Sequence, residues 1–165
     1  AVVAAAFEGS RFGHQGEADL IDALSTASPG ALSLVACDEE AIVGHALFSR
    51  VRLRTPQHHI VGMGLAPLAV SPAHQRQGIG GRLTGEGVER LFRDGCPFVV
   101  VLGHPEYYPR LGFQPAREYG IAHGFAGISQ DVFFVRFPPG SPLGVTEGQA
   151  WYEPAFGPQH EGAEA

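Results

Sequence analysis

The chain has 165 residues, enough to bury a hydrophobic core within one domain. Its 17 acidic and 11 basic residues give a formal charge of −6, which disfavours nucleic acid as a routine partner because phosphate backbones bind basic faces. No apolar run approaches the roughly 20 residues that span a bilayer, and two cysteines are too few for a disulfide framework, so we expect a soluble protein of the reducing cytoplasm without a membrane partner.

The N-terminal third predicts helices followed by a hairpin. Ala1–Phe7 is a short apolar run without a basic segment or an initiator methionine, and we interpret it as part of a helix in a chain trimmed at its N-terminus, not as a signal peptide. A second helix is expected over about residues 16–27, where Ser28-Pro29-Gly30 ends it. Leu32–Ala36 and Ala41–Phe48 flank a polar turn and predict a β-hairpin.

The middle of the chain predicts a strand, a helix and a second strand. Residues 51–59 are polar and contain a proline, which predicts an exposed connection or a frayed sheet edge. The run at 60–70 predicts a long strand, and its internal glycines and proline indicate a bulge or a close backbone approach. A helix-like run at Leu83–Arg93 and a short apolar strand at Phe98–Leu102 complete a βαβ unit, in which the two strands are parallel.

The C-terminal third predicts one more strand, Gln130–Phe137. Together with the hairpin and the βαβ unit, this predicts an α/β fold with a mixed sheet and helices on its faces. We see no internal repeat and expect a single domain over residues 1–165, with a loose tail at about 155–165.

The most specific pattern is the turn between the strand at 60–70 and the following helix, Gln75-Arg76-Gln77-Gly78-Ile79-Gly80-Gly81. Glycines before a helix leave backbone N–H groups exposed at its positive end, where anions bind. A dinucleotide site would need Gly-x-Gly-x-x-Gly followed by an acid, and a P-loop would need a lysine, which the chain lacks. The turn therefore predicts a phosphate site of another kind.

Two motifs carry a family resemblance. Gln75-x-x-Gly78-x-Gly80 resembles the acetyl-coenzyme A (acetyl-CoA) signature of the GNAT superfamily of N-acetyltransferases, and Tyr108-x-x-x-Gly112-Phe113 is similar to that family's Tyr-x-x-x-Gly-Phe segment. The resemblance covers roughly residues 34–113 and looks most like small bacterial acetyltransferases of unassigned substrate. It implies a mostly antiparallel mixed sheet in which one central parallel pair is splayed apart.

The resemblance also implies a donor and its binding residues. Acetyl-CoA would be the cosubstrate, and its pantetheine arm would pair with the backbone of Leu68, Ala69 and Val70 like an added strand. A backbone N–H near Ala69 or Val70 would stabilise the oxyanion. The pyrophosphate would lie on the N–H groups of the turn, formed by Gln75, Arg76, Gln77, Gly78, Ile79, Gly80 and Gly81.

The implied reaction is direct attack of a primary amine on the thioester in a ternary complex. Tyr108 is our candidate general acid for the departing sulfur, with Tyr107 as the second choice, because a phenol is protonated at neutral pH. The general base is left open among Glu106, His104, His58 and His59.

The sequence gives no sign of a metal site, and it leaves the function, the acceptor and the oligomeric state open. The histidines show no metal-ligand spacing, so no metal is expected. The alternative function is a catalytically idle acyl-CoA sensor or regulatory domain on the same fold. Neither the amine acceptor nor the formation of a homodimer can be read from these residues.

Overall fold

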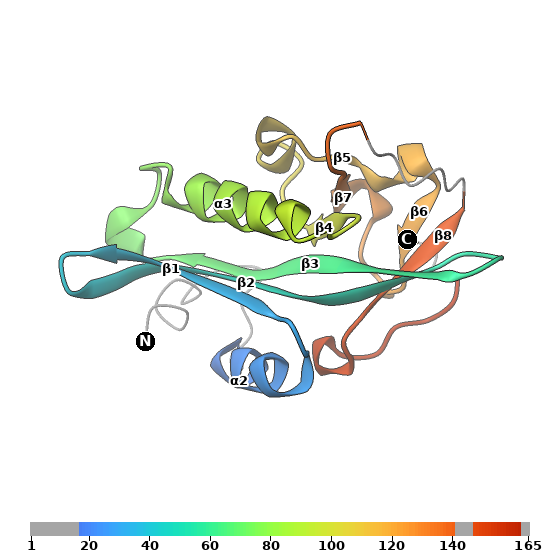
Figure 1. The fold of residues 1–165 in the computed structure, drawn as a ribbon, viewed down its shortest axis with the longest axis horizontal. Coiled ribbons are helices and arrows are strands. Elements are labelled where there is room, and N and C mark those ends of the chain that lie inside the picture. The colour runs from blue at the N-terminus through green and yellow to red at the C-terminus, as the bar shows by residue number, and fades with distance from the viewer. Residues whose placement is uncertain (1–16, 141–146, 163–165) are drawn as a thin grey trace.

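The computed structural model describes residues 17–140 and 147–162, so the helix fragment expected at Ala1–Phe7 lies outside the described residues (Figure 1). The helices are α2 (Glu17–Ala27) and α3 (Ile79–Arg93). The strands, in chain order, are β1 (Leu32–Asp38), β2 (Ala41–Arg54), β3 (His59–Val70), β4 (Val99–Leu102), β5 (Gln114–Pro115), β6 (Ile121–His123), β7 (Phe133–Arg136) and β8 (Gly148–Tyr152). Short 3-10 turns connect several of them, among them Pro72–His74, Tyr108–Leu111 and Pro154–Phe156.

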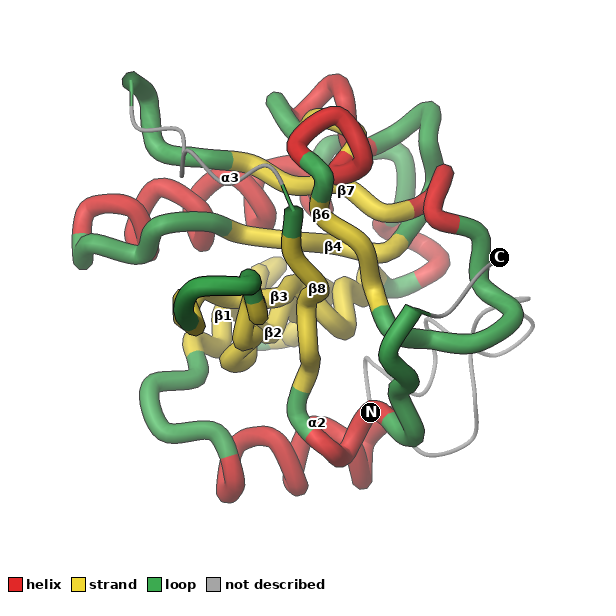
Figure 2. The backbone as a smooth tube through the Cα atoms, turned by 90° about the vertical axis from the view of Figure 1, so that its right-hand side faces the viewer, coloured by secondary structure: helices red, strands yellow, loops and turns green. Residues whose placement is uncertain are grey.

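The strands form one mixed sheet in the order β5-β7-β4-β3-β2-β8-β6, and β1 pairs with the first part of β2. The pairs β3–β4 and β6–β8 are parallel and the others are antiparallel. Helix α3 covers one face of the sheet and α2 lies on the other (Figures 1 and 2). The mixed α/β fold, mostly antiparallel with one central parallel pair and helices on both faces, is therefore confirmed.

The hairpin of β2 and β3 is longer than the sequence suggested. Residues 51–54, expected in an exposed connection, continue β2, and the prediction for them was wrong. Val51 and Leu53 are fully buried while Arg52 and Arg54 are exposed, which is the alternation of a strand with one buried face. Only residues 55–58 form the turn, closed by the Thr55 N–H donating to the His58 carbonyl at 3.0 Å.

The C-terminal segment adds two strands, β6 and β8, that the sequence did not indicate. After β8 the chain is hydrogen-bonded: the Tyr152 N–H donates to Gln159 Oε1 at 2.8 Å, and the His160 N–H donates to the Gly124 carbonyl at 2.7 Å. The Gly162 N–H donates to Gln149 Oε1. Residues 155–162, expected to be loose, are thus held against β6 and β8.

Helix α3 packs tightly on β2. A Cβ at Gly87 would lie 2.2 Å from the Phe48 ring, so only a glycine allows this approach of helix to strand. Hydrophobic side chains fill the layer between α3 and the sheet, and a second apolar cluster fills the opposite face; the first includes Phe48, Leu65, Leu83, Val88 and Val99, and the second includes Val51, Leu53, Phe98, Val100 and Phe133. Among the described residues no helix is long and apolar enough to cross a membrane.

Candidate active site

The parallel strands β3 and β4 separate after a short contact. They pair only at Met63 with Val99 and Gly64 with Val100, and the Met63 N–H donates to the Phe98 carbonyl at 3.1 Å. Strand β3 continues to Val70 without a strand partner on that side, because β4 ends at Leu102. We call the space between residues 65–70 and the end of β4 the opening. Its backbone edge is available to an extended ligand.

The direction of the backbone groups along the opening follows from one hydrogen bond at the end of β3. The Ser71 N–H donates to the Val43 carbonyl on β2 at 2.8 Å. Because N–H groups alternate between the two sides of a strand, those of Leu68 and Val70 point into the opening and that of Ala69 points toward β2. The register between β2 and β3 shifts where Ala66-Pro67 lies opposite Leu47, which is a bulge at the middle of the opening.

The glycine-rich turn lies between the end of β3 and the start of α3. Gln75 Nε2 donates to the Val70 carbonyl at 3.0 Å, which fixes the turn to the strand. Arg76 and Gly78 have positive φ angles of 61° and 80°, and Gly78 is the N-cap of α3. No side chain caps this helix, so its first N–H groups remain for another acceptor. Gln77 and Arg76 are exposed and Ile79 is buried.

The start of α3, the end of β3 and Tyr107 meet at Gly80. A Cβ on Gly80 would lie 2.8 Å from the Tyr107 hydroxyl and 3.7 Å from the side chains of Leu68 and Val70. At the neighbouring Gly81, a Cβ would lie 4.0 Å from the same hydroxyl. The absence of a side chain at position 80 therefore allows the Tyr107 hydroxyl to approach the first turn of α3 closely.

Tyr108 occupies the end of β4. A Cβ on Gly103, directly after β4, would lie 2.2 Å from the Tyr108 ring. The ring is buried and contacts Phe113 and Tyr107 edge to face, with centroids 5.7 Å and 5.1 Å away. Burial raises the pKa of Tyr108 well above its usual value, and the Tyr107 phenol raises it further. Burial also raises the pKa of Tyr107, so both phenols keep their protons at neutral pH.

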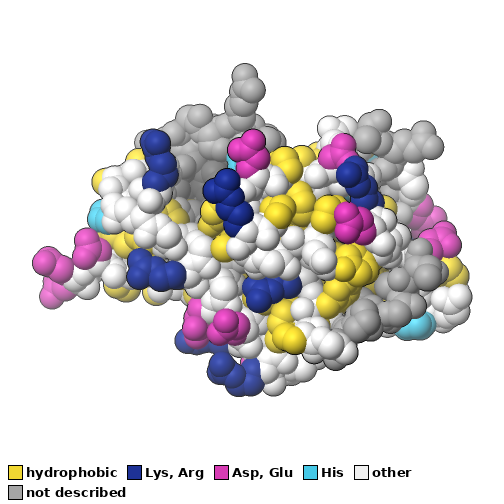
Figure 3. All heavy atoms as spheres, turned by 90° about the horizontal axis from the view of Figure 1, so that it is seen from above, with side chains coloured by type: hydrophobic (Ala, Val, Ile, Leu, Met, Phe, Trp, Pro, Cys, Tyr) yellow, Lys and Arg dark blue, Asp and Glu magenta, His cyan; other side chains and the backbone are white. Residues whose placement is uncertain are grey.

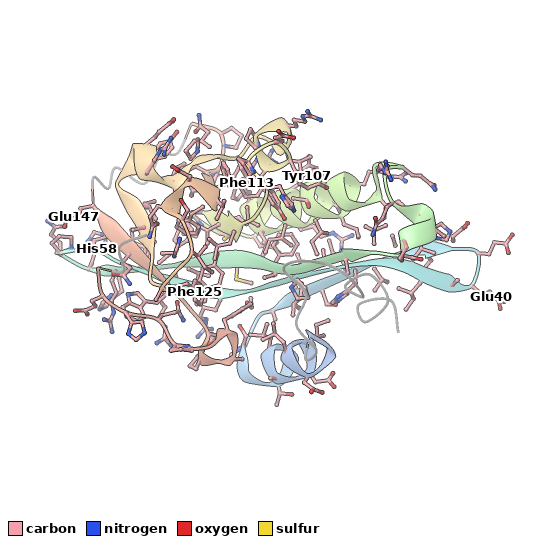
Figure 4. The ribbon with its side chains drawn as sticks, turned by 180° about the vertical axis from the view of Figure 1, so that it is seen from behind. Glu40, His58, Tyr107, Phe113, Phe125 and Glu147 are labelled. Carbon is pink, nitrogen blue, oxygen red and sulfur yellow. The ribbon has the colours of Figure 1, made fainter. Side chains whose placement is uncertain are left out.

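The four residues proposed for the general base lie in two places. Glu106 and His104 are exposed in the turn before Tyr108, and the His104 carbonyl accepts the Tyr107 N–H at 3.0 Å. His58 and His59 lie at the far end of the β2–β3 hairpin, well away from Tyr107 (Figure 4). The structure brings only the first two beside the tyrosines.

On the sheet face away from α3, the structure reveals polar side chains that the sequence analysis missed. His45 lies opposite Ala69 across the β2–β3 ladder, and its Nε2 lies 2.8 Å from the Ser33 hydroxyl. Burial lowers the pKa of His45, and its Nδ1 is buried without a hydrogen-bond partner. Ser49 and Tyr152 also have buried hydroxyls without partners. The signal available in the sequence was the presence of His45 and Ser49 in an otherwise apolar strand.

A groove of about 460 Å³ lies between β1 and α3, and Gln77 and Ile79 of the glycine-rich turn line part of it. Arg82, Glu86 and Arg90 line it, and an ion pair of Asp38 with His74 at 3.3 Å lies beside it. Arg82, which flanks the glycine turn in the sequence, thus lines this groove. From the α3 side, acidic and arginine side chains are intermixed with apolar patches, without one dominant charge (Figure 3). The residues that the structure describes contain no cluster suited to a metal ion.

An opening between two parallel strands, next to an uncapped helix start, is a geometry suited to an extended ligand with an anionic end. A model of the acetyltransferase (GNAT) family matches residues 4–113, and the chain belongs to this family.

The chain is similar to two curated proteins of Escherichia coli K12. The first is the uncharacterized N-acetyltransferase YjhQ, 49% identical over 111 residues, an alignment that covers 63% of this chain and 59% of YjhQ. The second is the uncharacterized N-acetyltransferase YhbS, 33% identical over 136 residues, covering 82% of this chain and 80% of YhbS. The chain thus spans less than two-thirds of the length of YjhQ.

Two solved structures share the fold of this chain, each at about one-third sequence identity. A GNAT family acetyltransferase from Brucella melitensis in complex with acetyl-CoA has a TM-score of 0.74 at 32% identity, with coverage of 94% of this chain and 88% of that chain. YhbS from Escherichia coli in complex with CoA has a TM-score of 0.78 at 30% identity, with coverage of 93% and 84%. Both of these relatives bind the coenzyme.

Proposed function

We propose that the chain transfers an acetyl group from acetyl-CoA to a primary amine by direct attack on the thioester. The observation that carries this proposal is the separation of β3 from β4 next to the uncapped start of α3, with Gly80 facing the Tyr107 hydroxyl. The coenzyme complexes of the Brucella melitensis relative and of YhbS support acetyl-CoA as the donor.

The donor would bind along the opening. The N–H groups of Leu68 and Val70 would bond to the amide oxygens of the pantetheine arm, which then extends the sheet as an added strand. The pyrophosphate would lie on the N–H groups of the turn from Gln75 to Gly81, at the positive end of α3. A side chain at Gly80 would occupy the path between these two parts of the coenzyme.

The chemistry would use the same strand and a phenol. A neutral amine attacks the carbonyl carbon, and the resulting oxyanion is stabilised by a β3 N–H, an interaction worth about 2.7–4 kcal/mol in comparable sites. Of the two residues considered from the sequence, Val70 directs its N–H into the opening and Ala69 does not, and Leu68 offers a second such group. The C–S bond then breaks as Tyr108 gives its proton to the thiolate, and the amine loses a proton to a base.

The alternative is an idle acyl-CoA sensor on the same fold, and two measurements separate it from the enzyme. Thermal unfolding with CoA and with acetyl-CoA tests binding of the donor, and thiol release from acetyl-CoA with a broad panel of primary amines tests transfer. Stabilisation together with thiol release supports the enzyme. Stabilisation without thiol release for any amine favours the sensor, and the absence of both contradicts the donor site.

A further inference from the structure

Two hydroxyl groups are buried without a partner on the sheet face away from α3. Ser49 on β2 is fully buried, Tyr152 on β8 is 7% exposed, and neither side-chain oxygen has a hydrogen-bond partner in the described part of the chain. A buried polar atom is normally hydrogen-bonded, because leaving it unpaired costs free energy. Two such atoms on one face therefore need an explanation.

Both hydroxyl-bearing residues lie at the closed end of the opening. Gly64 is the last residue of β3 that pairs with β4, and Ser49 lies directly opposite it across the β2–β3 ladder. The Tyr152 ring covers Gly64 from the same side, since a Cβ there would lie 2.6 Å from the ring. The ring therefore lies where the two parallel strands begin to separate.

The Tyr152 ring is held firmly in this place. Phe125 and Phe156 contact it with centroids 5.4 Å and 5.3 Å away, and Tyr152 pairs with Val51 in the sheet. Phe125 packs in the apolar cluster of this face, whereas Tyr107 lies beside α3 on the other side (Figure 4). The phenol is thus positioned by ring packing and by the β2–β8 pairing, and its enclosed hydroxyl is left without a partner among the described residues.

Tyr152 and Tyr108 approach the opening from opposite faces of the sheet. Tyr108 packs in the apolar cluster beneath α3, and Tyr152 packs in the cluster on the other face. Burial raises the pKa of Tyr152, and the Tyr108 phenol raises it further. Tyr152 is therefore a neutral phenol at physiological pH and cannot serve as the base.

We propose that the Tyr152 hydroxyl binds the acceptor amine, by accepting a hydrogen bond from one of its N–H groups on the face opposite α3. This inference rests on the proposed acetyl transfer. In that reaction the donor enters beside α3 and the leaving sulfur meets Tyr108, so the nucleophile attacks from the other face. The hydrogen bond leaves the nitrogen lone pair directed at the carbonyl carbon. Tyr152 forms and breaks no covalent bond.

The test compares Tyr152→Phe with Tyr119→Phe, a matched control whose hydroxyl bonds to the exposed Gln114 side chain. The probe is the primary amine that gives the fastest thiol release with the wild-type chain. In Tyr152→Phe we expect kcat/KM for this amine to fall about tenfold, the effect of one lost hydrogen bond. The KM for acetyl-CoA should not change, and Tm should not fall, because the removed hydroxyl had no partner. Tyr119→Phe should match the wild type.

A second variant, Gly64→Ala, keeps the phenol but displaces its ring, and it should lower kcat/KM for the amine similarly. Unchanged amine kinetics in Tyr152→Phe would overturn the proposal. If Tyr152→Phe weakened the binding of acetyl-CoA but not of CoA, and the KM for the amine did not change, the hydroxyl would bind the acyl group instead. That result would also overturn the proposal. If the wild-type chain released no thiol with any amine, the proposed transfer and this inference would both fail.

Discussion

The Tyr107 hydroxyl lies 2.8 Å from the point where a side chain on Gly80 would begin. This contact joins the first turn of α3 to the segment that follows β4, beside the end of β3. A side chain at position 80 would collide with the Tyr107 hydroxyl, whereas one at Gly85, in the same helix, would meet no atom within 4 Å.

Gly80→Glu should therefore abolish the stabilisation of the chain by CoA. The new side chain fills the junction, and its carboxylate repels the pyrophosphate at the helix start. The measurement is the change of Tm with CoA concentration, and Gly85→Glu is the matched control, which should keep the wild-type response. An undiminished response in Gly80→Glu would place the coenzyme elsewhere.

Tyr108→Phe should lower kcat with little change in the affinity for acetyl-CoA. A general acid contributes about 10²–10⁴-fold to a rate, and the phenyl ring preserves the contact with Phe113. Tyr107→Phe serves as the comparison, because its hydroxyl points at Gly80. If only Tyr107→Phe lost activity, the general acid would be Tyr107; if neither did, solvent would protonate the sulfur.

Two glycines of α3 should respond in opposite ways to the same change. Gly87→Ala should lower the free energy of unfolding by about 1–3 kcal/mol, since its Cβ would lie 2.2 Å from the Phe48 ring. Gly85→Ala should raise it by about 0.5–1 kcal/mol, because nothing opposes the methyl group and helix propensity improves. Urea unfolding measures both, and equal effects would contradict the close packing of α3 on β2.

Burial lowers the pKa of His45 and His123 below the usual 6.5. The unfolded chain therefore takes up protons first as the pH falls through 6.5, and the folded chain becomes less stable. Below pH 6.5, each of the two histidines should lower the free energy of unfolding by up to about 1.4 kcal/mol per pH unit. Above pH 6.5, neither should change it. His45→Gln should flatten the fall of stability between pH 7.5 and 5.5 relative to the wild-type chain. Equal slopes would indicate that His45 is protonated in the folded chain.

Local patterns predicted the site better than its surroundings. Strand β3 and the start of α3 follow from local sequence patterns, whereas the roles of the turn at residues 75–81 and of Tyr108 come from the family resemblance and stay predictions. The face away from α3 is built from β2, β6 and β8, which pair across long stretches of chain. The two- and three-residue strands β5 and β6 are too short for periodicity to reveal. Tyr152 reaches Gly64 only through this pairing, which no local pattern encodes.

The most direct test of the donor site is a crystal structure of the chain with CoA. We expect density for the pantetheine arm between residues 65–70 of β3 and the end of β4, with the pyrophosphate on the N–H groups from Arg76 to Gly81. Density for the pantetheine arm in the groove between β1 and α3, lined by Arg82 and Arg90, with none beside residues 65–70, would contradict the account.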